Sequence, residues 1–294
     1  MNGPMPIRSP NPPRGQVLLS AAQLTRPLNC VLTAISVWVG AVTSGGNHAG
    51  YTILFAGLGA AAIAAAGNGM NDVIDLEVDR CNRPHRPLPS GRLSIGAALV
   101  LSALLGVTGL TLAFLAGVLP GMIAFIVVTG LALYNWLLKR VGLAGNVLVS
   151  LIAAATFPYG AAAAGAWGRW WIPALFAACY HLARELVKGV EDVEGDGIAG
   201  VRTMARLCGI PTTCRVAAIL LGLVGFTAPL PGLLGVYGVA YLIPVFALDL
   251  FLLRMVRRLW SGPWPGDTRL SQQLLFGMLL GLTAVLLGEF VDRT

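Results

Sequence analysis

Nine long apolar runs constrain the fold of this chain more than any other feature of its sequence. They lie at residues 27–44, 51–70, 95–117, 120–138, 143–165, 170–190, 213–231, 234–256 and 272–290. Each is close to the length of roughly 20 mainly apolar residues that a transmembrane helix requires. Backbone polar groups in lipid must be bonded internally, so only helices and closed barrels cross a bilayer. Because barrel strands alternate polar and apolar residues and these runs do not, the sequence predicts an all-α membrane protein with nine transmembrane helices.

The composition agrees with a lipid environment. Only 11% of the residues are charged, against about 25% in soluble proteins, and the mean hydropathy is +0.76. Residues 1–20 are rich in proline, and we expect them to form a disordered cytoplasmic tail. We expect residues 21–294 to form a single transmembrane domain.

Membrane topology explains the net charge of +7 better than nucleic-acid binding does. With nine spans, every lysine and arginine except Arg169 and Arg293 falls on one side of the membrane. The positive-inside rule makes this side cytoplasmic. We therefore expect a multi-pass protein of the cell membrane, with its N-terminus inside and its C-terminus outside. Neither a nucleic-acid partner nor an obligate protein partner is indicated.

Nine of the 13 acidic residues form two clusters at the cytoplasmic ends of spans. The first cluster follows the second span, in the segment N-G-M-N-D-V-I-D-L-E-V-D. If the helix continues at about 100° per residue, one narrow arc carries five polar side chains and Glu77 points away from it. The five are Asn68, Asn71, Asp72, Asp75 and Asp79. Carboxylates stacked in this way repel one another unless a cation lies between them.

The second cluster repeats the spacing of the first. Asp192 and Asp196 are four residues apart, as are Asp75 and Asp79. The preceding span carries a polar stripe, and polar residues placed inside a membrane usually mark a functional site. The stripe consists of His181, Arg184, Glu185 and Lys188.

The two clusters offer carboxylate and amide oxygens without cysteine or histidine, which suits Mg²⁺ or Mn²⁺ better than zinc or copper. Magnesium is usually held by few carboxylates together with substrate phosphates. We therefore expect two Mg²⁺ ions, with Mn²⁺ as a possible substitute, to bridge the clusters to a diphosphate. Lys139 and Lys188 are placed to neutralise the remaining negative charge. Solvated helix ends also carry acidic residues, but the paired spacing favours a ligand site.

A proline- and arginine-rich loop, R-C-N-R-P-H-R-P-L-P-S-G-R, follows the first cluster. Its three prolines and Gly91 exclude a regular helix. The positive-inside rule alone would explain arginines here. Because the prolines stiffen the loop, we favour a role in binding an anion.

These motifs resemble those of the UbiA superfamily of intramembrane prenyltransferases. N-D-V-I-D-L-E-V-D at Asn71–Asp79 fits the family's first motif, and E-D-V-E-G-D at Glu191–Asp196 fits the second. The resemblance implies a helical bundle around a central cavity, with a polyprenyl diphosphate as donor. It implies metal or diphosphate ligands at Asn71, Asp75, Asp79, Asp192 and Asp196, to which the helical arc adds Asn68 and Asp72.

Within the superfamily, the chain is most similar to archaeal enzymes that transfer a geranylgeranyl group to geranylgeranylglyceryl phosphate. The N-R-P-H-R-P-L-P-S-G-R loop, the segment from Lys188 to Asp196 and the segment from Tyr134 to Asn146 carry this likeness. It implies formation of the second ether bond of archaeal membrane lipids, with a lipid phosphate as acceptor.

The expected roles divide into two groups. We expect Asp75, Asp192, Lys139 and Lys188 to be catalytic, with an aspartate of either motif taking the acceptor's proton. The expected substrate-binding residues are Arg26, Arg83, Arg86, Arg92, Tyr134 and Asn146. Among these, Arg26, Arg86 and Arg92 are candidates for the phosphate of the acceptor.

Two alternatives stay open at the level of sequence. One is prenylation of an aromatic acceptor, such as 4-hydroxybenzoate or a quinone precursor. The other is a secondary transporter, since transporters also carry carboxylates in membrane helices. The acids lie at the ends of spans next to the arginine loop, which favours a phosphate site over a translocation path.

Overall fold

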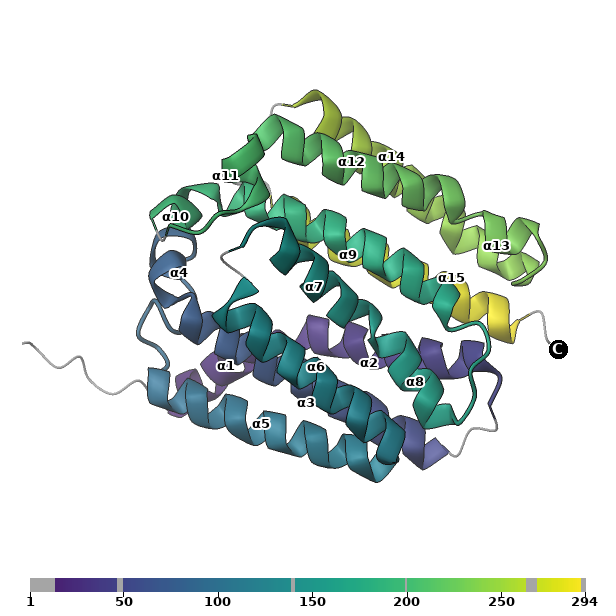
Figure 1. The fold of residues 1–294 in the computed structure, drawn as a ribbon, viewed down its shortest axis with the longest axis horizontal. Coiled ribbons are helices and arrows are strands. Elements are labelled where there is room, and N and C mark those ends of the chain that lie inside the picture. The colour runs from purple at the N-terminus through teal and green to yellow at the C-terminus, as the bar shows by residue number, and fades with distance from the viewer. Residues whose placement is uncertain (1–13, 47–49, 139–140, 199, 263–268, 292–294) are drawn as a thin grey trace, which may run out of the picture.

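The computed structural model describes residues 14–46, 50–138, 141–198, 200–262 and 269–291, and the regular elements in these ranges are all helical. Most of the long helices lie side by side in a bundle, with α4, α10 and α11 gathered at one end (Figure 1). The helices are α1 Arg14–Thr25, α2 Pro27–Ser44, α3 Gly50–Ile74, α4 Leu76–Asn82, α5 Ile95–Ala116, α6 Val118–Trp136, α7 Leu143–Ala154, α8 Thr156–Ala164, α9 Trp171–Glu191, α10 Val193–Ile198, α11 Met204–Cys208, α12 Ile210–Thr227, α13 Leu230–Leu233, the 3₁₀ helix η2 Val239–Tyr241, α14 Leu242–Ser261 and α15 Leu270–Phe290.

The helices confirm the predicted all-α membrane architecture, and the protein is a multi-pass membrane protein. Eight helical segments of the described chain are long and apolar enough to cross a bilayer. The predicted sixth span corresponds to α9, which has 21 residues but falls outside that group of eight. Its charged side chains Arg184, Glu185 and Lys188 explain the difference, because they lower its hydropathy without shortening it.

Several predicted boundaries differ from the structure, including those of the eighth span and of the N-terminal tail. The eighth span was expected at residues 234–256, but its helical segment runs from Val239 to Ser261. The N–H groups of Val236 and Tyr237 both donate to the carbonyl of Pro231, so this stretch forms a turn before the helix begins. Residues 14–20, expected in the tail, belong to α1, while residues 1–13 lie outside the described chain.

Small residues allow the helices to approach closely, as is common in membrane bundles. A Cβ at Gly40 of α2 would collide with the backbone of Phe157 in α8, and one at Gly160 of α8 would collide with Val37 in α2. Helix ends use expected signals: Pro27 opens α2, and the Ser94 hydroxyl accepts a hydrogen bond from the Ala97 N–H (3.2 Å) at the start of α5. This packing sets the positions of the helices that carry the polar motifs.

Candidate active site

The two aspartate motifs lie at equivalent breaks between helices. Asp75 separates α3 from α4 with φ −86° and ψ 6°, and Asp192 separates α9 from α10 with φ −99° and ψ 6°. The backbone N–H groups of Asp79 and Asp196 donate to the carbonyls of Asp75 and Asp192, at 2.7 and 2.9 Å. Since these bonds keep the spacing of a helical turn across each break, the later aspartate stays near the face of the earlier one.

The first motif is buried and surrounded by arginines. Asp72 and Asp79 are 3% and 1% exposed. The Arg86 guanidinium lies between them, 3.2 Å from Asp72 and 2.5 Å from Asp79, and Arg26 also donates to Asp72. Glu77 is exposed and pairs with Arg80 instead. It therefore points away from the other acids, as the helical arc predicts.

Arg83 and Asn82 join the second motif to the first. The Arg83 guanidinium lies 2.6 Å from Asp192 and 3.5 Å from Asp79. The Asn82 amide donates to the Asp192 carbonyl (3.3 Å) and accepts from the Gly195 N–H (3.1 Å). A Cβ at Gly195 would overlap the Asn82 side chain. The structure thus brings motifs 117 residues apart in sequence to one charged cluster.

Charge compensation within this cluster is incomplete. Burial raises the pKa of the Asp79 carboxyl above its usual range, although Arg86 opposes the effect. Burial likewise lowers the pKa of Arg86, with the Arg26 charge adding to the effect. For Arg83, burial acts to lower the pKa, but the carboxylates, chiefly Asp192, raise it overall. The site would therefore stabilise both additional cations and an anionic ligand.

A cavity of about 340 Å³ opens beside the motifs and runs into the bundle. Asn68, Asn71 and Tyr134 line it near the motifs. Asn71 donates to the Asp75 carboxylate (2.9 Å), and Asn68 donates to the carbonyl of Thr25 (3.0 Å). Further along, apolar side chains line most of the wall, which suits a hydrocarbon chain.

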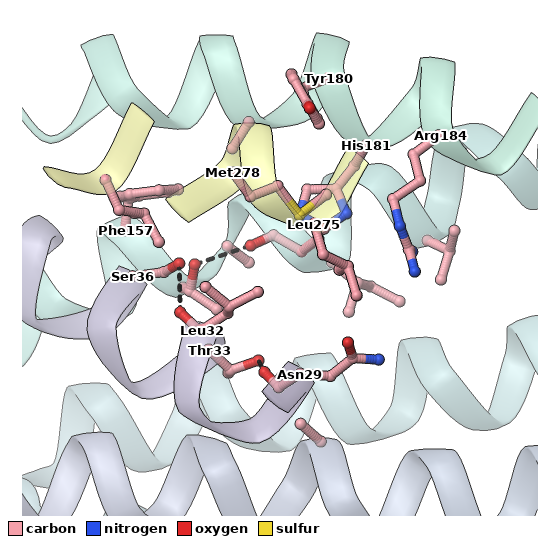
Figure 2. Close-up of a pocket in the computed structure, with 18 of the residues that line it drawn as sticks. Asn29, Leu32, Thr33, Ser36, Phe157, Tyr180, His181, Arg184, Leu275 and Met278 are labelled. Carbon is pink, nitrogen blue, oxygen red and sulfur yellow. Dashed lines mark hydrogen bonds between the residues drawn. The ribbon is translucent and has the colours of Figure 1, made fainter. Parts of the chain in front are cut away.

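Polar side chains from two helices also line the apolar part of the cavity. Figure 2 shows Asn29, Thr33 and Ser36 of α2 opposite His181 and Arg184 of α9. Thr33 and Ser36 donate their hydroxyls to backbone carbonyls of their own helix, at 2.9 and 2.8 Å. Their oxygens stay available as hydrogen-bond acceptors toward the cavity.

A second charged group lies on α9 along the cavity wall. Lys188 donates to both carboxylate oxygens of Glu185, at 3.1 and 2.9 Å, and Arg184 lies 3.5 Å from the same carboxylate. Arg184 also donates to the carbonyl of Ser271 (3.0 Å). Glu191 accepts from the backbone N–H and the hydroxyl of Ser271, so it caps α15 rather than facing the motifs.

Some predicted site residues lie elsewhere. Arg92 is half-buried and donates to the His85 carbonyl (2.5 Å), Ser90 and Gln23 at the surface. Asn146 is on α7 and is not among the residues that line the cavity. Lys139 falls outside the described residues. Arg92 was assigned from its place in the proline- and arginine-rich loop, and that pattern does not reveal the direction of each side chain.

Two site residues were given no individual role from the sequence. Asn82 is the direct link between the motifs, and the local pattern carries no signal for a partner 110 residues away. Asn135, next to Tyr134, is 8% exposed and lines the cavity. Its side-chain oxygen has no hydrogen-bond partner among the described residues. A buried polar atom without a partner is costly, so a substrate group is a natural partner for it.

The donor atoms fit magnesium, although no three metal-ligating side chains converge among the residues described. Arginines hold Asp72, Asp79 and Asp192 instead. The carboxylates and side-chain amides of the two motifs offer oxygen atoms as ligands. Magnesium commonly takes one or two protein carboxylates and completes its shell with water and phosphate. A preformed three-carboxylate site is therefore not required for a metal–diphosphate complex.

A multi-pass helical bundle whose two aspartate motifs meet at the mouth of an apolar cavity defines an intramembrane prenyltransferase. The model of the UbiA prenyltransferase family matches residues 31–274, and the chain belongs to this family. A relative from Sulfolobus acidocaldarius, named digeranylgeranylglyceryl phosphate synthase, is 41% identical over 233 residues, covering 78% of this chain and 84% of that protein.

Solved structures agree with this family. A structure of digeranylgeranylglyceryl phosphate synthase has a TM-score of 0.67 and 28% identity, covering 94% of this chain and 99% of that chain. A UbiA homolog from Archaeoglobus fulgidus, bound to GPP and Mg²⁺, has a TM-score of 0.60 and 16% identity, covering 90% and 99%. The second likeness concerns the fold alone. Membership of a prenyltransferase family favours the transferase over the transporter interpretation.

Proposed function

We propose that the protein transfers a geranylgeranyl group from its diphosphate to the free hydroxyl of geranylgeranylglyceryl phosphate. The product would be digeranylgeranylglyceryl phosphate, the compound in the name of the Sulfolobus relative, with a second ether bond formed. The observation that carries this proposal is the meeting of both aspartate motifs around Arg83 beside an apolar cavity. Such a site separates a polar pocket for diphosphate from an apolar pocket for the prenyl chain.

The arginines that now hold the aspartates are suited to hold the donor. Arg83 and Arg86 each contact more than one carboxylate, and guanidinium groups bind diphosphate oxygens with the same geometry. When a diphosphate arrives, these side chains can turn toward it and release carboxylate oxygens. Lys188 is placed one turn before Asp192 and can add a further positive charge.

The released oxygens would hold two Mg²⁺ ions, with Mn²⁺ as a substitute. The proposed ligands are Asn68, Asn71, Asp72, Asp75, Asp79, Asp192 and Asp196. Magnesium, when bound, neutralises charge on the departing diphosphate oxygens. The A. fulgidus homolog was solved with GPP and Mg²⁺, which supports a metal–diphosphate site in this fold.

The cavity would exclude water from the reactive allylic carbon while the acceptor hydroxyl approaches it. Arg26 and Arg86 remain candidates for the acceptor's phosphate, since Arg92 is turned to the surface. Tyr134 lies on the cavity wall within range of the Glu185, Asp75, Asp196 and Asp192 charges, so it is placed to contact the donor near the reacting bond.

We also propose that the site faces the cytoplasm in the cell membrane, with the C-terminus outside. The distribution of lysine and arginine supports this orientation, because cytoplasmic loops carry an excess of both. Both substrates are amphiphiles, with an anionic end and a hydrocarbon chain. They can reach the site from the membrane without leaving it completely.

An aromatic acceptor is the second candidate, and one assay separates the two. Purified enzyme with Mg²⁺ and geranylgeranyl diphosphate is offered geranylgeranylglyceryl phosphate or 4-hydroxybenzoate in parallel. We expect the diether phosphate from the first acceptor and no prenylated product from the second. Prenylated 4-hydroxybenzoate, without any diether product, would overturn the proposal.

A further inference from the structure

The carboxylate of Glu185 lies outside both aspartate motifs, yet it faces the substrate cavity. Glu185 is 8% exposed and lines the cavity from α9. A carboxylate in a membrane helix is costly to insert, so it is rarely retained without a role. Its neighbours Lys188 and Arg184 explain how the charge is tolerated, but not why an acid faces the cavity.

Its position along α9 matches the place where the new bond forms. Glu185 precedes Asp192 by seven residues, which is about 10 Å at 1.5 Å per helical residue. If the proposed function holds, the diphosphate lies at Asp192 and the prenyl chain extends into the apolar cavity. The first carbon of the donor then lies on the cavity side of the diphosphate, between the levels of Asp192 and Glu185.

Lys188 connects the two sites. Its ammonium donates to both Glu185 oxygens, at 2.9 and 3.1 Å, and one more helical turn reaches Asp192. A diphosphate carries more negative charge than one carboxylate and attracts a flexible lysine more strongly. Once Lys188 turns to the diphosphate, the Glu185 carboxylate loses its main partner and holds a proton more readily.

We infer that Glu185 is the base that accepts the proton of the acceptor hydroxyl, and that donor binding activates it by drawing Lys188 away. The acceptor's O–H bond breaks and its proton moves to the Glu185 carboxylate. The acceptor oxygen forms the bond to the first carbon of the donor. The bond from that carbon to the diphosphate breaks, and its electron pair leaves with the diphosphate.

The other candidate bases are less suited. Arginines hold Asp72, Asp79 and Asp192 in the structure, and Asn71 donates to Asp75. In the loaded enzyme these carboxylates would hold the metal ions, so their lone pairs would be engaged. His181 lies one turn before Glu185 on α9 and is therefore further from Asp192 along the helix. It is the alternative that the experiment below has to separate from Glu185.

The test compares Glu185→Gln, Glu185→Ala and His181→Gln with wild type, using Mg²⁺, geranylgeranyl diphosphate and geranylgeranylglyceryl phosphate. Glutamine can still bond Lys188 through its carbonyl oxygen, so the fold should survive. We expect kcat of Glu185→Gln to fall about 10²-fold, the usual effect of a general base. Binding of geranylgeranyl diphosphate with Mg²⁺, measured by calorimetry, should remain. Added formate should restore part of the activity of Glu185→Ala. The exposed Glu77→Gln serves as the matched control.

Each outcome supports or contradicts the role of Glu185 as the base. Unchanged kcat in Glu185→Gln, or loss without any rescue of Glu185→Ala by formate, would contradict the role as base. A larger kcat loss in His181→Gln than in Glu185→Gln would assign the base to His181. If wild type forms no diether product, the proposed function itself fails. Normal wild-type turnover with an unaffected Glu185→Gln rejects only the inference about Glu185.

Discussion

The two aspartate motifs share a local backbone conformation, but their side chains have different surroundings. Asp75 and Asp192 break their helices with nearly equal torsion angles, and each is followed by a second aspartate four residues later. In the first motif, Asp79 is 1% exposed and contacts two arginines. In the second, the Asp192 side chain is 17% exposed, and Arg83 is its ion-pair partner among the described residues.

The difference indicates that the two motifs have different structural roles. The first motif is buried, and Arg26 and Arg86 from neighbouring segments pair with its Asp72 and Asp79. The second motif depends on the first for its position, through Arg83 and Asn82. Substitutions of the residues that connect the two motifs should therefore reduce activity without removing a metal ligand.

The largest effect is expected when either motif loses its first aspartate. Asp75→Ala and Asp192→Ala should each reduce kcat about 10³-fold, because groups that stabilise departing charge contribute on this scale. Turnover of purified enzyme with Mg²⁺ and geranylgeranyl diphosphate measures this loss. Wild-type turnover in either variant would show that one motif suffices and that the site is not shared.

The second largest loss of activity is expected when the guanidinium that bridges the two motifs is removed. Arg83→Ala leaves Asp79 and Asp192 without their common partner, and a small displacement of reacting groups costs about 10²-fold in rate. Arg80→Ala is the matched control, since Arg80 pairs at the surface with Glu77. Equal kcat/KM values for the two variants would refute a joining role for Arg83.

A smaller effect is expected at the contact between Asn82 and Gly195. Gly195→Ala introduces a Cβ that overlaps the Asn82 side chain, and Asn82→Ala removes two hydrogen bonds, each worth about 1 kcal/mol. Each single variant should lose about tenfold in kcat/KM. The double variant should be no worse than Asn82→Ala alone, because the clash disappears with the side chain. Fully additive losses would place the two residues in separate roles.

The smallest predicted effect concerns thermal stability. Mg²⁺ alone should raise Tm little, because arginines occupy the carboxylates, whereas Mg²⁺ with pyrophosphate should raise it by several degrees. The reason is that an anion draws the arginines away and frees oxygens for the metal. Differential scanning fluorimetry in detergent measures both. An equal rise with Mg²⁺ alone would mean that the carboxylates bind metal without diphosphate.

The sequence predicted the membrane fold well, because lipid solvation acts on each helix separately. The first apolar run, residues 27–44, coincides with α2, Pro27–Ser44. The helical arc also separated Glu77 from Asp72 and Asp79, since the side-chain direction on one helix follows from its period. The end of the eighth span also differed, since the helix continues to Ser261 and arginines near its end do not stop a helix.

The contacts between distant segments could not be predicted in this way. The pairing of Asn82 with Asp192 and Gly195 depends on how α4 packs against α10. The outward direction of Arg92 depends on its bonds to Gln23 and to the loop backbone. Local periodicity carries no information on either, because both depend on tertiary packing.

A structure with Mn²⁺ and an unreactive thio-diphosphate analogue of geranylgeranyl diphosphate tests the shared site most directly. Anomalous scattering locates manganese independently of the protein atoms. We predict manganese at both motifs, with the diphosphate between Asp75 and Asp192 and the prenyl chain in the cavity. Manganese at one motif only, or a diphosphate bound away from Arg83, would contradict a single site built from both motifs.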